Sequence, residues 1–231
     1  MLRVGLTGSL GSGKSTVAAM LRELGAYVVE ADELGRALME PGQSVFSAIV
    51  EEFGREVLDS NGRLDRPRLA QLAFQEHRVG ELNAIIHPAA IEAQQRWMDE
   101  IFTRDPAAVA VVESALIFEV VRDARLRGET EGILADWRQT LDRIVVVTAP
   151  DEVNIARYAA RVAPPGPERV AAEADARRRL AHQIPDAEKA AQAKDVIENS
   201  GDLVALRSQV TALWKRLREE SNKSRGKLSL K

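Results

Sequence analysis

A glycine-rich run near the start of the 231-residue chain has the residue types and spacing of a phosphate-binding loop. Segment 8–15 reads GSLGSGKS and fills every fixed position of the pattern G-x-x-x-x-G-K-[ST]. Glycines let backbone N–H groups curl around phosphate oxygens, while a lysine reaches the β- and γ-phosphates and a serine hydroxyl ligates Mg²⁺. An ordinary glycine-rich turn is the alternative, but the flanking strand and helix patterns favour binding of a nucleoside triphosphate. The residues expected to hold it are Gly11, Ser12, Gly13, Lys14, Ser15 and Thr16.

Two carboxylates follow apolar runs that read as strands. Asp32 comes just after the run 27–30, and Glu113 ends the valine-rich run 109–112. In open α/β sheets, ligands bind at the carboxyl ends of the strands. Asp32 can accept a hydroxyl proton during γ-phosphoryl transfer, or it can cap a helix that begins near Glu33. Glu113 can orient Mg²⁺ and its waters, or it can be a surface acid at a strand end.

Arginines surround a proline-rich loop in the second half of the chain. Arg157 and Arg161 are four residues apart on one expected helix and share a face. The loop 164–167 follows, and three consecutive arginines come later, at 177–179. Guanidinium groups on a mobile lid suit a transferring phosphoryl group, because each donates two parallel hydrogen bonds. A solvated basic face paired with nearby acids is the alternative for each arginine, and we expect at least one of the set to act on phosphate.

The elements that must position these residues follow an α/β pattern. Apolar runs predict strands at 2–7, 27–30, 109–112, 144–148 and 196–197. The block from about 41 to 106 has only helical patterns, and within it we expect His87-Pro88 to form a turn where the proline opens a helix. The sequence therefore predicts a five-stranded parallel sheet flanked by helices, with a helical insert at about 41–106 and a lid at about 155–180.

Residues 1–220 are expected to form one domain that ends in an amphipathic helix. The remaining residues, 221–231, include four basic residues and no acid. We expect this basic tail to be frayed and disordered, as chain termini commonly are.

The composition excludes several functional classes. The chain has no cysteine, which rules out disulfide scaffolds, thiolate metal sites and cysteine nucleophiles. Its formal net charge of −3 provides no global basic field for nucleic acid, and no apolar run approaches the ~20 residues of a membrane-spanning helix. We therefore expect a cytoplasmic protein that binds neither nucleic acid nor membrane. The sequence does not specify its oligomeric state.

The phosphate-binding loop does not by itself identify the acceptor of a phosphoryl group. The chain lacks the N-K-x-D motif with which GTPases read guanine. A short chain with a helical insert and an arginine-bearing lid favours a small-molecule kinase, whose lid excludes water. A non-catalytic nucleotide-binding module is the rival class, but it would be expected to lose Lys14 or Asp32, and both are present.

A series of motifs, in this order along the chain, resembles the dephospho-CoA kinase family. The opening segment 5–18 reads GLTGSLGSGKSTVA and matches the family's G-L-T-G-x-x-G-S-G-K-S-T-V-A. The later matches are Pro41-Gly42, Phe53-Gly54, the L-D-R of 64–66, His87-Pro88, Gln183 and the I-E-N-S-G of 197–201. The resemblance runs from about residue 3 to residue 215 and is far more specific than the loop alone.

The resemblance implies a reaction and a set of acceptor-side roles. Members of the family transfer the γ-phosphoryl group of ATP to the 3′-hydroxyl of dephospho-CoA, giving CoA and ADP. Lys14 and Asp32 are then the expected catalytic residues, and Asp32 would accept or orient the hydroxyl proton. Arg66 and His87, in the insert, are expected to bind dephospho-CoA. Their alternatives are structural: an ion pair at a helix start for Arg66, and a capping group before Pro88 for His87.

The same resemblance implies roles on the ATP side. Arg157 and Arg161 would be lid residues near the phosphates, and Asn199 and Gly201 would lie near the adenine. Mg²⁺ is the expected metal. Its expected protein ligands are Ser15 and Glu113.

The chain departs from the family pattern at four places, one of which is Asn154, where the family often has glutamine. Glu30 replaces the first aspartate of a D-A-D segment that ends at Asp32. The segment 113–115, Glu-Ser-Ala, stands where the family has D-V-P. The acidic side chain is therefore longer by one methylene, and a proline is lost. The stretch 120–143 is longer than the family pattern, and we expect it to add a helix near the acceptor site.

Overall fold

The structure, a computed structural model, describes residues 1–228, apart from the side chains of residues 74 and 224–228. Within this range, five strands form one sheet in the order β2-β3-β1-β4-β5. The strands are β1 (Leu2–Thr7), β2 (Tyr27–Glu30), β3 (Val109–Glu113), β4 (Arg143–Thr148) and β5 (Asp195–Glu198). Every neighbouring pair is parallel, so all the carboxyl ends lie at one edge of the sheet. The predicted α/β class and parallel sheet are confirmed.

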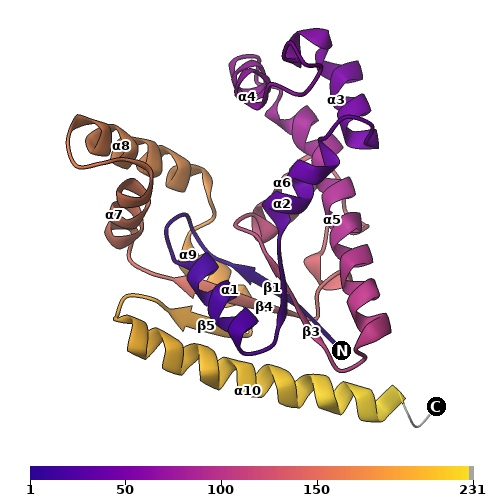
Figure 1. Cartoon of the computed structure of the whole chain (residues 1–231), viewed down its shortest axis with the longest axis vertical. Coiled ribbons are helices and arrows are strands. Elements are labelled where there is room, and N and C mark those ends of the chain that lie inside the picture. The colour runs from indigo at the N-terminus through magenta and orange to yellow at the C-terminus, as the bar shows by residue number, and fades with distance from the viewer. Residues whose placement is uncertain (229–231) are drawn as a thin grey trace.

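Helices connect the strands and follow the last one. They are α1 (Lys14–Glu23), α2 (Ala31–Leu38), α3 (Ser44–Phe53), α4 (Arg66–Gln75), α5 (Val79–Arg104), α6 (Ile117–Leu126), α7 (Asp151–Val162), α8 (Pro167–His182), α9 (Asp186–Gln192) and α10 (Leu203–Leu228), with single-turn 3₁₀ helices at Arg55–Val57 and Trp137–Gln139. In Figure 1, α2–α5 and the α7–α8 pair stand on either side of the loop between β1 and α1. None of the helices within residues 1–228 has both the length and the hydropathy to cross a bilayer.

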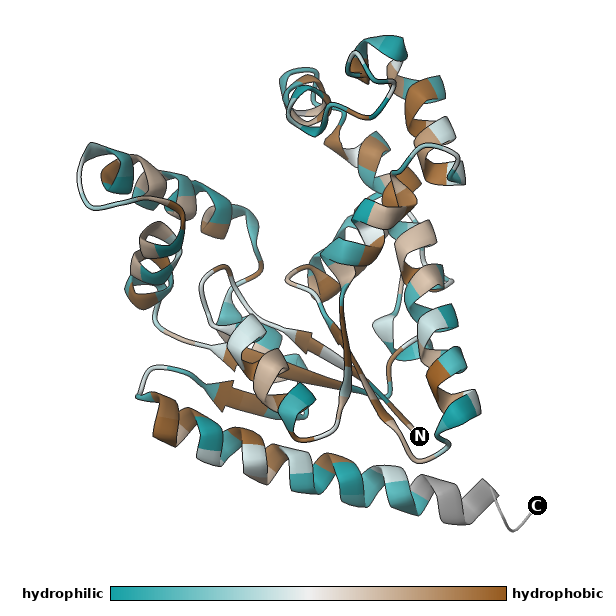
Figure 2. Cartoon of the chain, in the orientation of Figure 1, coloured by the Kyte–Doolittle hydropathy of each residue, from teal (hydrophilic) through white to brown (hydrophobic). Residues whose placement is uncertain are grey.

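Both faces of the sheet are buried, as parallel sheets require. Successive strand residues point to opposite faces, so Val109 and Val111 enter a core shared with α1 and α10. Ala110 and Val112 enter a second core, shared with α5 and α6. Figure 2 shows the sheet as a hydrophobic layer among helices with many hydrophilic residues. The sheet is therefore a rigid platform for the loops at its carboxyl edge.

Only helices lie between β2 and β3 among the described residues, and they have a core of their own. Ile49 and Phe53 of α3 pack there with Leu69 of α4. Helix α5 joins this insert to the sheet, because Ile85 packs on the insert core while Met98 is buried against the sheet. Helix α2 makes a second link, since Ala31 packs on the sheet core and Leu38 on the insert core.

The turn expected at His87-Pro88 is wrong. Pro88 lies inside α5, which runs unbroken from Val79 to Arg104. A proline within a helix removes one backbone hydrogen bond and costs about 3 kcal/mol. The apolar neighbours Ile86 and Ala89 pack on the insert core, and this burial outweighs the local cost.

The expectation of a frayed tail after Glu220 is also wrong for most of that segment. Helix α10 continues to Leu228, and residues 229–231 lie outside the described part of the chain. Ser221 is fully buried, and its hydroxyl donates to the carbonyls of Ala107 (2.8 Å) and Ala108 (3.1 Å). These bonds hold the helix against the start of β3, which a count of charges along the tail could not reveal.

The long stretch 120–143 does add secondary structure beside the insert. Most of α6 and the 3₁₀ turn at Trp137 come from it. Trp137 meets Phe118 edge-to-face, with ring centroids 6.4 Å apart, and packs on the second sheet core. The stretch therefore covers the sheet face near α5.

A buried ion pair holds α10 to the sheet and gives a test of this packing. Arg143 of β4 and Asp195 of β5 have side chains only 6% and 5% exposed, and they lie 2.5 Å apart. Arg216 of α10 also reaches Asp195, over 2.9 Å. We expect Asp195→Ala to lower the free energy of unfolding by about 2–3 kcal/mol, because the buried guanidinium of Arg143 loses its buried partner and keeps only the partly exposed Glu220 of α10.

The control for Asp195→Ala is the exposed pair between Glu23 and Arg207 of α10, with side chains 59% and 57% exposed. We expect Glu23→Ala to cost less than about 1 kcal/mol, because water screens that pair. Urea denaturation of both variants measures the two costs. Equal, small costs would contradict the importance of the buried pair.

Candidate active site

The loop between β1 and α1 has the shape that the phosphate-binding motif predicts. Gly11 and Gly13 have φ values of +78° and +92°, which side-chain-bearing residues rarely adopt. A Cβ atom on Gly11 would lie 2.1 Å from the carbonyl oxygen of Asn154, and one on Gly13 would lie 2.1 Å from Nδ2 of Asn199. These glycines are therefore required for both conformation and space. The loop leads directly into α1, which begins at Lys14.

Lys14 lies at the base of the loop. Its Nζ donates to the carbonyls of Gly8 (2.9 Å) and Ser9 (3.1 Å). Burial lowers the pKa of Lys14 to about 8, and the positive charges of Lys189 and Arg161 add to this shift, while Glu113 and Asp186 oppose it. The ammonium is thus held in a partly dry site, where its attraction for phosphate is strong.

Ser15 and Glu113 lie together, as expected of a Mg²⁺ site. The Ser15 hydroxyl donates to Glu113 Oε1 over 2.9 Å. Glu113 Oε2 is buried and has no hydrogen-bond partner among the described residues, and burial raises the pKa of Glu113. Carboxylate and hydroxyl oxygens are ligands that Mg²⁺ accepts, with phosphates and water completing its shell. No group of three or more acidic or histidine side chains is placed to hold a metal ion among the described residues.

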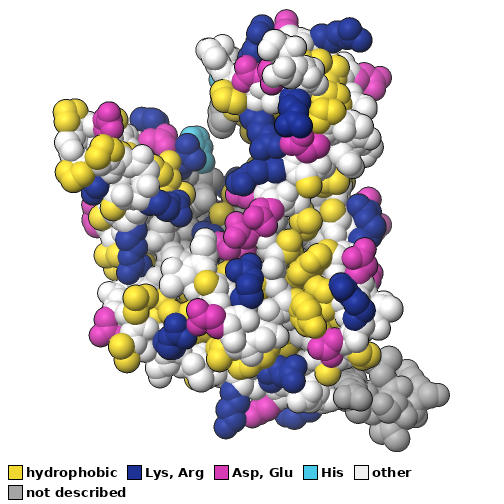
Figure 3. All heavy atoms as spheres, viewed as in Figure 1, with side chains coloured by type: hydrophobic (Ala, Val, Ile, Leu, Met, Phe, Trp, Pro, Cys, Tyr) yellow, Lys and Arg dark blue, Asp and Glu magenta, His cyan; other side chains and the backbone are white. Residues whose placement is uncertain are grey.

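A cavity of about 470 Å³ opens above the loop. Figure 3 shows the molecule hollowed between the insert and the α7–α8 pair. The cavity brings together predicted residues that lie far apart in the sequence. They are Gly11, Gly13, Lys14, Ser15, Thr16, Asp32, Glu113, Arg157 and Arg161, with Arg36 and Tyr158 as further lining residues. Ser12 is buried beneath the loop rather than on the cavity wall.

A second cavity of about 330 Å³ adjoins the first, on the insert side. Arg66 and His87 both line it, among mostly apolar residues of α2, α5 and α6. The two cavities share Asp32, Arg36 and Ser114. The residues predicted for donor and acceptor therefore lie in two different cavities that meet at Asp32.

His87 is not a cap before Pro88, because α5 passes through both residues. Its Nδ1 is buried and has no hydrogen-bond partner in the described chain, and burial lowers the pKa of His87, which favours the neutral ring. Arg66 begins α4 and lies 3.6 Å from Glu40, so its ion-pair alternative is present in part. Arg66 also donates to the Arg36 carbonyl over 3.3 Å, which turns it toward α2.

Asp32 does not cap α2. The helix begins at Ala31, the capping position belongs to Glu30, and no side chain caps that helix end. Asp32 is instead in the first turn, exposed to both cavities. The capping alternative is therefore wrong, because the helix starts two residues earlier than the sequence predicts.

The arginines expected in the lid divide into two groups. Arg157 and Arg161 of α7 line the first cavity. Arg177 of α8 instead makes a two-pronged pair with Glu152, at 2.7 and 2.8 Å. Its neighbours on α8 pair with Asp175. For residues 177–179, the solvated-face alternative is the one observed.

Neither Asn199 nor Gly201 lines the donor cavity. Asn199 Nδ2 donates to the Ser12 carbonyl over 2.8 Å, and its own carbonyl accepts from Arg157 over 2.8 Å. Asn199 thus joins the end of β5 to both the loop and α7. Gly201 follows in the bend before α10.

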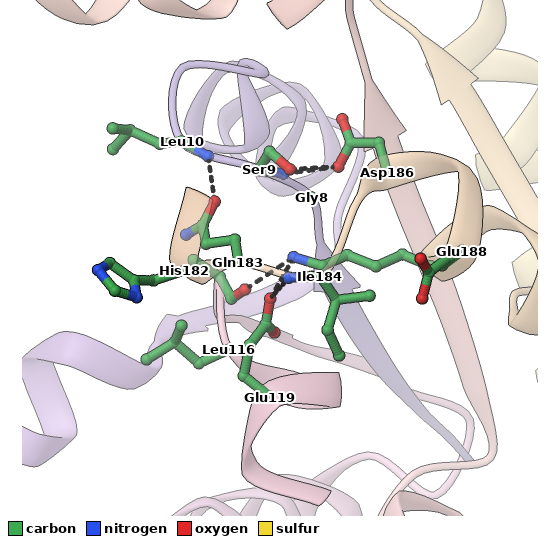
Figure 4. Close-up of polar contacts among 12 residues, drawn as sticks. Gly8, Ser9, Leu10, Leu116, Glu119, His182, Gln183, Ile184, Asp186 and Glu188 are labelled. Atoms are coloured by element: carbon green, nitrogen blue, oxygen red, sulfur yellow. Dashed lines mark hydrogen bonds and ion pairs between the residues drawn. The ribbon is translucent and has the colours of Figure 1, made fainter. Parts of the chain in front are cut away.

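Sequence reasoning missed the polar contacts that α8 and α9 make with the loop. Leu10 N donates to Gln183 Oε1 over 3.0 Å, and Ser9 contacts Asp186 (Figure 4). Gln183 was visible only as a motif position, and Asp186 follows a proline like an ordinary first residue of a helix. No local signal in the sequence distinguishes it.

A family model described as dephospho-CoA kinase matches residues 2–205. A protein named dephospho-CoA kinase from Moorella thermoacetica is 35% identical over 218 residues, which cover 94% of this chain and 92% of that protein. Another from Corynebacterium diphtheriae is 36% identical over 214 residues, which cover 92% and 96%.

Solved structures agree with the fold. The crystal structure of TT1252 from Thermus thermophilus superposes with a TM-score of 0.67 at 30% identity, covering 93% of this chain and 96% of that one. The structure of dephospho-CoA kinase from Campylobacter jejuni has a TM-score of 0.63 at 19% identity, covering 94% and 97%. At that identity the second likeness supports the fold alone.

The lowered pKa of Lys14 predicts how ATP affinity depends on pH. Below about pH 8 the side chain is the ammonium that attracts phosphate, and above it the neutral amine prevails. We expect the Kd for ATP, measured by calorimetric titration, to rise several-fold between about pH 7 and pH 9.5, well before an ordinary lysine would lose its proton. Lys14→Arg keeps its positive charge throughout this range. The Kd of this variant for ATP can differ from that of the wild type, but it should not change with pH. If the Kd for ATP of the wild type did not change with pH, Lys14 would not be a phosphate-binding group with a lowered pKa.

Proposed function

The chain belongs to the dephospho-CoA kinase family, and from this membership we infer that it transfers the γ-phosphoryl group of ATP to the 3′-hydroxyl of dephospho-CoA, giving CoA and ADP, the last step of CoA biosynthesis. The observation that carries the residue assignments is the pair of cavities that meet at Asp32. One is lined by loop backbone, four cationic side chains and three carboxylates, and the other is mainly apolar. This division suits a charged donor and a larger, less polar acceptor.

On the donor side, the loop amides of residues 11–16 would hold the triphosphate. Lys14 would neutralise charge on the β- and γ-phosphates as the bond to the leaving oxygen breaks. Arg157 and Arg161, on the opposite wall, would approach the same phosphates when α7 and α8 close over them. Closure would exclude water, which competes with the acceptor for the phosphoryl group.

The metal assignment is part of the same proposal. Ser15 Oγ and the buried, unpartnered oxygen of Glu113 would be the protein's contribution to a Mg²⁺ ion that arrives with ATP. When bound, the ion supplies Lewis-acid stabilisation of phosphate charge. The protein's own part is to orient Ser15, which it does through the hydrogen bond to Glu113.

On the acceptor side, the insert would bind dephospho-CoA. Arg66 and the neutral His87 are polar groups in a mainly apolar cavity, which is also lined by Asp32, Arg36, Gln94 and Ser114. The buried Nδ1 of His87 has no partner among the described residues, and we expect a hydrogen bond from a bound ligand to satisfy it. The ribose 3′-hydroxyl would then lie next to Asp32, at the junction with the donor cavity.

The transfer itself follows from this arrangement. The 3′-oxygen forms a bond to the γ-phosphorus, the bond to the β–γ bridging oxygen breaks, and ADP leaves with that electron pair. The hydroxyl proton passes to the Asp32 carboxylate, or is oriented by it. Asn199 and Gly201, at the end of β5, would lie toward the adenine of ATP. Asn199 would act there mainly through its hydrogen bond to the loop.

A panel of acceptors tests the substrate assignment. Dephospho-CoA, AMP, CMP and shikimate would be offered with Mg-ATP in a coupled ADP-release assay. We expect kcat/KM for dephospho-CoA to exceed the others by at least ~100-fold, or about 2.7 kcal/mol in transition-state binding. Equal or faster turnover of AMP or shikimate would instead identify another small-molecule kinase.

Asp32→Asn tests the role of the shared carboxylate. Asparagine keeps the size of the side chain but loses the basic oxygen, so we expect kcat to fall by roughly 10²–10⁴-fold. The Kd for ATP should change little, because the loop holds the triphosphate. Glu33→Gln is the matched control, since Glu33 is the next residue of the same helical turn, is exposed, and lines neither cavity. Wild-type kcat in Asp32→Asn would shift attention to Glu30, which also lines the donor cavity.

A further inference from the structure

The segment that joins α8 to α9 contacts the first residues of the phosphate-binding loop, Ser9 and Leu10. Figure 4 shows Gln183 and Asp186 pointing toward Leu10 and Ser9. These contacts join residues separated by more than 170 positions in the sequence. They are the direct link between the loop and the end of the lid helix.

The contact at Ser9 is the stronger of the two. Asp186 Oδ1 accepts from the Ser9 backbone N–H over 3.0 Å and from the Ser9 hydroxyl over 2.6 Å. Ser9 is only 3% exposed, and its carbonyl accepts from Lys14 Nζ over 3.1 Å. A carboxylate that accepts two hydrogen bonds in a buried setting is a strong anchor. It fixes the peptide that also positions Lys14.

The segment itself is held in place from the other side. Ile184 N donates to Glu119 Oε1 over 3.0 Å, and Lys189 pairs with the same oxygen over 2.7 Å. The side chains of Lys189 and Glu119 are 0% and 5% exposed. Lys189 also reaches the Ala115 carbonyl over 3.4 Å, on the rim of the donor cavity. The contacts of Ile184 and Lys189 with the buried Glu119 therefore fix the position of Asp186 next to Ser9.

We propose that Asp186 is a positioning residue for phosphoryl transfer, which holds Ser9 and thereby keeps the phosphate-binding loop in the shape that receives the triphosphate. The proposal rests on the proposed function, because it presumes that the loop binds ATP. Glycine-rich loops have many accessible conformations, so an anchor present before binding lowers the ordering cost of binding. Asp186 would therefore affect the binding of ATP and not the binding of the acceptor, because it lines no part of the acceptor cavity.

The chain offers a matched control for Asp186. Asp151 is also the first residue of its helix and also follows a proline at the capping position, Pro150 instead of Pro185. It is exposed and does not line the donor cavity. A substitution there tests the general cost of losing an aspartate at a helix start.

The experiment compares Asp186→Ala, Asp186→Asn and Asp151→Ala with the wild type. For Asp186→Ala we expect the Kd for ATP, measured without acceptor, to rise about tenfold, because both hydrogen bonds that hold Ser9 are lost and ATP binding must then order the loop. KM for dephospho-CoA should change less than about twofold, since the acceptor cavity is untouched. Asp186→Asn should restore most of the ATP affinity, because its amide oxygen still accepts from Ser9. Asp151→Ala should behave like the wild type.

Amide hydrogen exchange adds a readout that a general loss of stability would not produce. We expect faster exchange in residues 8–16 of ligand-free Asp186→Ala, with unchanged exchange in β3 and β4. Should Asp186→Ala fail to fold, Ser9→Ala removes the 2.6 Å bond from the other side and should raise the Kd for ATP in the same direction. Where both fold, the double variant should be less affected than the sum of the two.

Wild-type ATP affinity and loop exchange in Asp186→Ala would overturn the proposal. So would equal losses toward ATP and dephospho-CoA with a matching drop in melting temperature, or an effect of the same size in Asp151→Ala. Failure of the wild type to phosphorylate dephospho-CoA would count against the proposed function instead. The Kd for ATP does not depend on that acceptor, so the two failures are distinguishable.

Discussion

The parallel direction of all five strands is the constraint on which the rest of the structure depends. It brings the carboxyl ends of β1, β2 and β3 to one edge, with Glu30 of β2 directly in register with Glu113 of β3. The phosphate-binding loop leaves β1 beside them, and Asp32 follows β2. Groups more than 80 residues apart thus meet in one cavity. Because both faces of the sheet are covered, this edge is where the sheet meets the cavities.

The loop's shape depends on partners from outside it. Its glycines permit the tight curl, but they also give the loop many other conformations in the unfolded chain. The backbone at Asn154 leaves no room for a side chain at Gly11, and Asn199 holds the Ser12 carbonyl. The α8–α9 segment adds its contacts from a third direction. The loop is therefore shaped before any ligand arrives, which is the condition for electrostatic stabilisation of phosphate charge.

The two cavities differ in chemistry because different layers build them. The donor cavity lies on backbone N–H groups and cations, between the sheet edge and α7. The acceptor cavity lies among mainly apolar side chains of α2, α5 and α6, and Arg66, His87 and Gln94 are the polar residues that it does not share with the donor cavity. The insert has a core of its own and reaches the sheet through α5 and α2. Helix α2 borders both cavities, and its Asp32 and Arg36 line both, so Asp32 is the carboxylate placed where donor and acceptor chemistry meet.

The sequence by itself determined the phosphate-binding loop, the α/β class, the order of strands along the chain and the family, because these follow from local spacing and from periodicity within single elements. Only the tertiary structure decided the outcomes at Pro88 and beyond Glu220, where packing against distant segments outweighs a helix breaker and a run of charge. It also decided that Glu30 takes the capping position, which leaves Asp32 to line both cavities. Asp186 shows the same limit: its partner Ser9 lies 177 residues away. The local sequence determines which conformations each segment favours, and burial against segments distant in the sequence determines which of these conformations is adopted.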